Sequence, residues 1–208
     1  MTAPPSERAD LAAIFAGGAG TRMGGADKGA VIFAGRPLHS VVAGRLAPQA
    51  KALAVLAPQA PAWLGDNPGA LWLADAAEAK GPAAGLIAAL RWLRAEQGDD
   101  ALLLTAPVDA PFLPADLFDK LETARREAGA PAAIVRHAGG LHPVFGLWRA
   151  NCAGAVEDAL QADRALHRIA DKVGAVHCKA WSAVSPDPFA NLNTPEDVAA
   201  AETRLRSQ

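Results

Sequence analysis

Short apolar runs alternate with longer segments of helical character along the chain, and this alternation constrains the fold more than any other feature. The runs are rich in Ala, Val, Ile and Leu and end at Gly or Pro, as is typical of strands buried on both faces. Strands are predicted at residues 11–16, 30–33, 52–56, 70–73, 101–105, 132–135, 143–148 and 175–178. Helices are predicted at residues 37–46, 82–96, 114–128, 151–160, 164–170 and 195–206. The pattern predicts an α/β fold with three α/β/α layers around a mostly parallel sheet.

Several helix starts carry a recognisable residue signal. Pro37, Pro82 and Pro114 stand where a proline is tolerated in the first turn of a helix. Thr194 precedes the last helix as a candidate N-cap, and Asp197 follows three residues later, as in a capping box. These signals set the predicted boundaries.

Length and composition predict one folded unit. The chain has 208 residues, of which 51% are hydrophobic, enough for a sizeable core. We expect residues 1–10 to form a flexible polar leader and residues 11–208 a single domain, because no repeat, linker or composition break divides them. The five tryptophans are interpreted mainly as packing residues.

Charge and cysteine content argue against several functional classes. The formal net charge of −2 gives no general attraction for nucleic acid or for an anionic membrane. Cys152 and Cys178 have no zinc-ligand spacing, and they are expected to be reduced thiols. Because no signal peptide or membrane-spanning run is visible, the predicted location is cytoplasmic.

A glycine-rich stretch, LAAIFAGGAGTRMGGADKG, follows the first predicted strand at residues 11–29. It is not a Walker A loop, because Lys28 is preceded by Asp27, and it is not a dinucleotide fingerprint, because Met23 replaces the third glycine. Glycines let successive N–H groups turn toward a phosphate, and Arg22 and Lys28 would add positive charge. The residues alone leave two interpretations open, a phosphate-binding loop and a plain turn between a strand and a helix.

The loop AGGAGTRMGGADKG resembles the nucleotide-binding loop of nucleotidyltransferases, and its DKG ending resembles the molybdenum cofactor guanylyltransferase family in particular. Further resemblances to that family, in the same order, are GRPL (35–38), RLAPQ (45–49), GPAAGLIAAL (81–90), APVDAPFLPADL (106–117), HPVFGLW (142–148) and NLNTPED (191–197). The resemblance covers nearly the whole chain. It implies a Rossmann-like nucleotidyltransferase fold and the transfer of GMP from GTP to Mo-molybdopterin, with release of pyrophosphate.

The resemblance also implies roles for individual residues. Arg22, Lys28 and Asp109 would be catalytic, with Asp109 as the carboxylate that holds Mg²⁺. The implied nucleotide-binding residues are Phe15, Ala16, Gly17, Gly18, Gly20, Lys28, Leu56, Asp75 and Asp109. The implied candidates on the side of the molybdenum cofactor are His142, Asn191 and Asn193. For the aspartates, asparagines and histidine, an ordinary turn or loop role remains the alternative.

One position departs from the family pattern. Leu56 stands where the family usually has an asparagine that helps to hold the nucleotide. The departure puts the choice of base in doubt more than the reaction, so a cytidylyltransferase or a sugar-1-phosphate nucleotidyltransferase remains an alternative. A further alternative is a non-catalytic protein that binds and delivers the cofactor. The partners implied are GTP, Mo-molybdopterin and, as candidates, maturation partners of molybdoenzymes.

Overall fold

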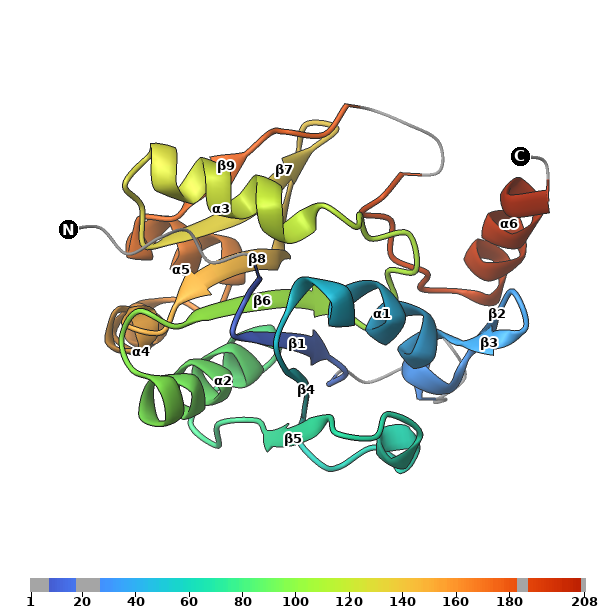
Figure 1. Cartoon of the computed structure of the whole chain (residues 1–208), viewed down its shortest axis with the longest axis horizontal. Coiled ribbons are helices and arrows are strands. Elements are labelled where there is room, and N and C mark those ends of the chain that lie inside the picture. The colour runs from blue at the N-terminus through green and yellow to red at the C-terminus, as the bar shows by residue number, and fades with distance from the viewer. Residues whose placement is uncertain (1–7, 18–26, 183–186, 207–208) are drawn as a thin grey trace.

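The computed structural model describes residues 8–17, 27–182 and 187–206 (Figure 1). Its strands are β1 (Leu11–Phe15), β2 (Ile32–Phe33), β3 (Arg36–Pro37), β4 (Leu53–Ala57), β5 (Leu71–Ala74), β6 (Leu102–Pro107), β7 (Ala132–His137), β8 (Gly140–Arg149) and β9 (Val176–Cys178). Its α-helices are α1 (Leu38–Leu46), α2 (Pro82–Gln97), α3 (Leu117–Glu127), α4 (Cys152–Ala162), α5 (Leu166–Val173) and α6 (Pro195–Arg206). Short 3-10 turns are η2 (Lys28–Ala30), η3 (Ala47–Gln49) and η4 (Ala62–Asp66).

The central sheet has the strand order β5-β4-β1-β6-β8-β7-β9. Strands β5, β4, β1 and β6 pair in parallel, and so do β7 and β9. Strand β8 runs antiparallel to both of its neighbours, β6 and β7. The sheet is therefore mixed but mostly parallel, which confirms the predicted class.

Two apolar cores cover the two faces of this sheet. Alternate residues of a strand point to opposite faces, so Ala12 and Ile14 join one core while Leu11, Ala13 and Phe15 join the other. Helices α1 and α3 close the first core, and α2, α4 and α5 close the second. The three-layer α/β/α prediction is confirmed, and its near-continuous apolar strands reflect burial on both sides.

Two tight hairpins were not fully anticipated. Ala138 and Gly139 both have positive φ values, 46° and 79°, and they turn β7 back into β8. Ala34 and Gly35, with φ values of 49° and 77°, turn β2 into β3 in the same way. Such two-residue turns match the right-handed twist of paired strands. Pro37 is the last residue of β3 and the N-cap residue of α1. The helix therefore begins at Leu38, one residue later than predicted.

The carboxyl end of the predicted leader 1–10 is held by the folded body. Ala9 is fully buried, and its N–H donates to the Gln49 carbonyl at 3.0 Å. Asp10 accepts from Lys51 Nζ at 2.7 Å and from the Leu102 N–H at 2.8 Å. Residues 9–10 therefore continue the amino end of the internal strand β1, while residues 1–7 lie outside the described ranges. Among the described helices, none is long and apolar enough to cross a bilayer.

Candidate active site

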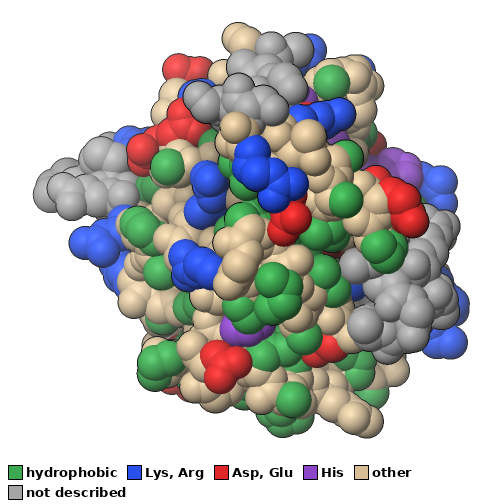
Figure 2. Space-filling view, turned by 90° about the vertical axis from the view of Figure 1, so that its right-hand side faces the viewer, with side chains coloured by type: hydrophobic (Ala, Val, Ile, Leu, Met, Phe, Trp, Pro, Cys, Tyr) green, Lys and Arg blue, Asp and Glu red, His purple; other side chains and the backbone are tan. Residues whose placement is uncertain are grey.

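The strand order reverses at β1, which has β4 on one side and β6 on the other. In open α/β sheets, ligands bind outside the carboxyl ends of the strands at such a switch point. The Val108 N–H donates to the Phe15 carbonyl at 3.0 Å, so the loops after β1 and β6 leave the sheet side by side. Figure 2 shows the molecule from this end, with Lys and Arg side chains gathered near the centre of the face.

Lys28, Asp109 and Asn193 meet at this switch point although they are far apart in the sequence. Lys28 Nζ lies 2.7 Å from Asp109 Oδ2 and 2.8 Å from Asn193 Oδ1. The ammonium thus binds two acceptors and is still partly accessible, with 26% of the Lys28 side chain exposed. The structure brings together three of the residues that the sequence analysis singled out.

Asp109 presents one carboxylate oxygen that is not used. Its side chain is 7% exposed, and Oδ1 is buried with no hydrogen-bond partner in the described part of the chain. A buried, unpaired carboxylate oxygen is costly unless a ligand satisfies it. No described group of three or more His, Cys, Asp and Glu side chains is arranged for a metal. One free carboxylate oxygen nevertheless fits Mg²⁺, which is often held by a single carboxylate plus phosphates and water.

A capping box fixes Asn193 at the start of α6. Asp197 Oδ2 accepts from the N–H groups of Asn193 and Thr194, both at 2.9 Å. The Asp197 N–H donates in return to Thr194 Oγ1 at 3.1 Å. The Leu192 N–H donates to the Asp109 carbonyl at 2.8 Å, so this segment is tied to the β6 loop. Asn191 is exposed, and its carbonyl accepts from Asn193 Nδ2 at 3.4 Å.

Asp75 lies at the other side of the switch point, after β5. A side-chain carbon added to Gly17 would come within 3.3 Å of Asp75 Oδ2, and one added to Gly85 within 3.2 Å of Oδ1. The carboxylate therefore sits between two glycines that allow its close approach. Burial raises the pKa of the Asp75 carboxyl above its ordinary value.

Leu56 directs its side chain into the core under α2. It is 1% exposed, and its Cβ would lie 3.0 Å from a side-chain carbon on Gly85. Its carbonyl accepts from the N–H groups of Ala16 and Gly17, at 2.9 and 3.2 Å. Leu56 thus places apolar atoms beside Asp75, where the resemblance led us to expect an amide.

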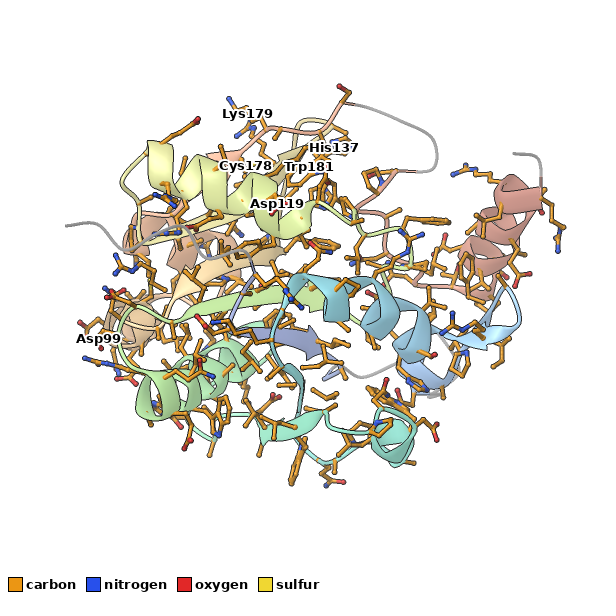
Figure 3. All side chains as sticks on the ribbon, in the orientation of Figure 1. Asp99, Asp119, His137, Cys178, Lys179 and Trp181 are labelled. Atoms are coloured by element: carbon orange, nitrogen blue, oxygen red, sulfur yellow. The ribbon has the colours of Figure 1, made fainter. Side chains whose placement is uncertain are left out.

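His142 belongs to an aromatic cluster on the β7–β8 side. Its ring lies 5.6 Å from that of Phe189, which also packs on Phe145 and Trp181. Burial lowers the pKa of His142, and the nearby Asp187 opposes that shift. His137, nearly buried, lies 3.5 Å from Asp187 through Nε2 (Figure 3).

The remaining predicted site residues belong to the carboxyl end of β1 and to the glycine-rich loop after it. Phe15 is buried, Ala16 is half-buried and Gly17 is exposed, in line with a strand that ends at the ligand edge. Gly18, Gly20 and Arg22 lie outside the described residues. Trp63 contacts the turn that carries Lys28, and sequence reasoning missed this contact because a lone Trp carries no spacing signal.

The mostly parallel sheet and the lysine–aspartate pair at the carboxyl ends of β1 and β6 are typical of a nucleotidyltransferase. Comparisons with known proteins identify the family. The MobA-like NTP transferase domain matches residues 12–178. A Rhodopseudomonas palustris (strain BisB5) protein named molybdenum cofactor guanylyltransferase is 42% identical over 92% of this chain and 91% of its own length. A protein of the same name from Cereibacter sphaeroides is 44% identical over 93% and 95%. The chain belongs to the MobA-like NTP transferase family.

A solved structure agrees on the fold. The molybdopterin-guanine dinucleotide biosynthesis protein A from Archaeoglobus fulgidus superimposes with a TM-score of 0.75 at 24% identity, covering 95% of this chain and all of that one (100%). At that identity the likeness concerns the fold alone.

Proposed function

We propose that this protein is a molybdenum cofactor guanylyltransferase, which joins GMP from GTP to the terminal phosphate of Mo-molybdopterin. In the reaction, a phosphate oxygen of Mo-molybdopterin attacks the α-phosphorus of GTP. A new P–O–P bond forms, the bond between the α-phosphorus and the bridging oxygen breaks, and pyrophosphate leaves. The relatives named above carry this activity in their names, and they match more than nine tenths of the chain.

The observation that carries the proposal is the pair of Lys28 and Asp109 at the switch point. Phosphoryl chemistry of this kind needs positioning and charge neutralisation more than a covalent group. Lys28 Nζ pairs with Asp109 Oδ2 at 2.7 Å, and its flexible side chain would let the ammonium turn from this carboxylate to a phosphate oxygen of bound GTP. Asn193 keeps the ammonium in the site while it changes partner, since it accepts from the same nitrogen at 2.8 Å.

Asp109 would hold Mg²⁺ through the free Oδ1. Bound there, Mg²⁺ supplies Lewis-acid charge neutralisation on the phosphate oxygens. The tie between the Asp109 carbonyl and the Leu192 N–H fixes the position of this carboxylate relative to Asn193. The roles of Gly18, Gly20 and Arg22 as further phosphate ligands stay predictions.

Asp75 is our candidate for reading the base. An ionised carboxylate offers only acceptors, and the Watson–Crick edge of guanine presents two neighbouring donors, N1–H and N2–H. Adenine and cytosine present one donor group there beside acceptors, which a carboxylate would repel. A polar site left unpaired by the wrong base gives strong discrimination. The donors on guanine would therefore select GTP in spite of Leu56.

Pyrophosphate release measured with GTP, CTP, ATP and UTP tests this function, with and without Mg²⁺ and Mo-molybdopterin. We expect release only with GTP, Mg²⁺ and the acceptor together. A preference for CTP would replace the proposal by cytidylyl transfer. Binding of GTP and acceptor with no pyrophosphate release under any condition would favour the delivery protein instead. The predicted cytoplasmic location and the maturation partners stay predictions.

A further inference from the structure

Trp63 contacts the turn that carries Lys28, although it comes from η4 on a different part of the chain. Its indole Nε1–H donates to Asp27 Oδ2 at 2.8 Å, and the ring is 6% exposed. The other oxygen of Asp27 accepts from the Gly29 N–H at 2.8 Å. Asp27, which precedes Lys28, therefore uses one carboxylate oxygen to bind the Trp63 indole and the other to bind Gly29, which follows Lys28.

The contact between Trp63 and Gly29 leaves no space for a side chain. A Cβ on Gly29 would lie 2.6 Å from Trp63 Cε2, closer than real Cβ atoms approach such an atom. The indole therefore lies directly against the backbone of η2. A turn in van der Waals contact with a buried ring on one side cannot shift toward that ring.

His39 of α1 holds Trp63 from its face. The two rings are stacked, with centroids 4.5 Å apart and planes within 7° of parallel. His39 is 1% exposed, and its Nδ1 is paired with Asn67 Nδ2 at 2.9 Å. The order of contacts runs from α1 through His39 and Trp63 to Asp27 and Gly29, so a rigid helix supports the turn.

We propose that Trp63 is a positioning residue that fixes the Lys28 ammonium for phosphate binding, acting through Asp27. A lysine side chain has four rotatable bonds and about 2 kcal/mol of rotamer entropy. When the backbone of Lys28 is fixed, its ammonium can reach fewer positions. The acceptor oxygens of Asp109 and Asn193 then favour one of these positions. The inference rests on the proposed role of Lys28 in phosphate binding.

Trp63→Phe tests the inference because it keeps an aromatic ring beside His39 and removes the N–H that reaches Asp27, together with part of the ring surface against Gly29. Trp181→Phe is the matched control, since Trp181 Nε1 also donates to a carboxylate oxygen, Asp116 Oδ1, at 3.0 Å. Trp181 lies beside α3 near the β9 edge of the sheet (Figure 3), whereas Trp63 precedes β5 at the opposite edge. Both variants lose one indole hydrogen bond to an aspartate.

Calorimetry with GTP and with inorganic tripolyphosphate, in wild type and in a Lys28→Ala background, provides the readout. We expect Trp63→Phe to weaken both ligands about threefold to tenfold, as the loss of one ordinary intramolecular hydrogen bond implies, and Trp181→Phe to leave both unchanged. In the Lys28→Ala background, Trp63→Phe should cause no further loss, because its effect passes through the missing ammonium. General damage to the fold would add to the loss in either background.

The outcomes separate this inference from the proposed function. If Lys28→Ala weakens GTP binding and Trp63→Phe does not, or if the Trp63→Phe loss persists without Lys28, the positioning role is overturned. If Lys28→Ala itself leaves GTP affinity unchanged, the role of Lys28 is refuted and the inference is refuted with it. Should Trp63→Phe fail to fold, Asp27→Ala removes the acceptor from the other side, and its loss should likewise vanish in the Lys28→Ala background.

Discussion

Leu56→Asn introduces the residue that the resemblance in the sequence analysis implies for this position, and the structure allows its effects to be worked out. Leu56 is 1% exposed, so the change removes a buried side chain worth about 2–4 kcal/mol of folding free energy. The new amide would lie next to Asp75, because both residues flank the same point over Gly85, at 3.0 Å and 3.2 Å. A hydrogen bond to that carboxylate returns about 1–2 kcal/mol.

The net expectation is a destabilisation of up to about 3 kcal/mol. For a chain of this size, that lowers the Tm by up to about 12 °C. The amide would also lower the raised pKa of Asp75, since a donor favours the ionised carboxylate. GTP affinity should rise by about fivefold or less, which corresponds to roughly 1 kcal/mol.

Thermal unfolding and calorimetry with GTP, ATP and CTP measure both effects, and Leu56→Ala is the control. Leu56→Ala removes a similar amount of apolar packing and brings no amide. We expect Leu56→Asn to bind GTP more tightly than Leu56→Ala, and to lose that advantage in an Asp75→Ala background. An asparagine variant that binds GTP no better than the alanine variant would refute the contact between residue 56 and Asp75.

Three further predictions concern the metal, the fold and pH. Asp109→Asn should lower Mg²⁺-dependent pyrophosphate release by about two orders of magnitude or more, while calorimetry without metal shows nearly unchanged GTP binding. Gln49→Leu should lower stability by about 2–4 kcal/mol in urea unfolding, because Gln49 Oε1 accepts from the buried Phe118 N–H at 2.9 Å and its Nε2 donates to two carbonyls. Burial lowers the pKa of His39 below 6.5 in the folded protein. As the pH falls, His39 is therefore protonated in the unfolded chain before it is protonated in the folded protein. Stability should be full above pH 6.5 and fall as the pH drops below it, and His39→Gln should flatten that urea-unfolding profile.

Local signals in the sequence predicted the elements and part of the site. The capping box at Thr194 and Asp197 was predicted from residue types three apart, and both of its hydrogen bonds are present. Gly17 and Asp109 were each placed just after a predicted strand, and in the structure those two strands, β1 and β6, pair in parallel. These features depend on short stretches and on a rule for parallel sheets.

Long-range features could not be predicted in this way. The apolar run of β8 has no alternation that could reveal its direction, and only the short turn at Ala138 and Gly139 makes it antiparallel. The contact of Trp63 with Asp27 joins residues 36 apart, and no periodicity encodes it. The sequence gives no sign that Leu56 faces α2 rather than the ligand edge, because a strand buried on both faces is apolar at every position.

The position of Asn193 has a consequence for the order of events during synthesis. Its side chain meets Lys28 across 165 residues, and the α6 residue Glu202 accepts from the Ala34 N–H at 2.8 Å across 168. Helix α6 lies apart from both sheet-covering layers, in a small apolar cluster with Phe33 and Leu38. Because the N-terminal part of a chain is synthesised first, the sheet can assemble before the contacts of Asn193 and Glu202 with Lys28 and Ala34 can form. The ammonium of Lys28 therefore gains its second acceptor last, and the proposed phosphate site of a nascent chain is complete only when residues 193–206 have emerged.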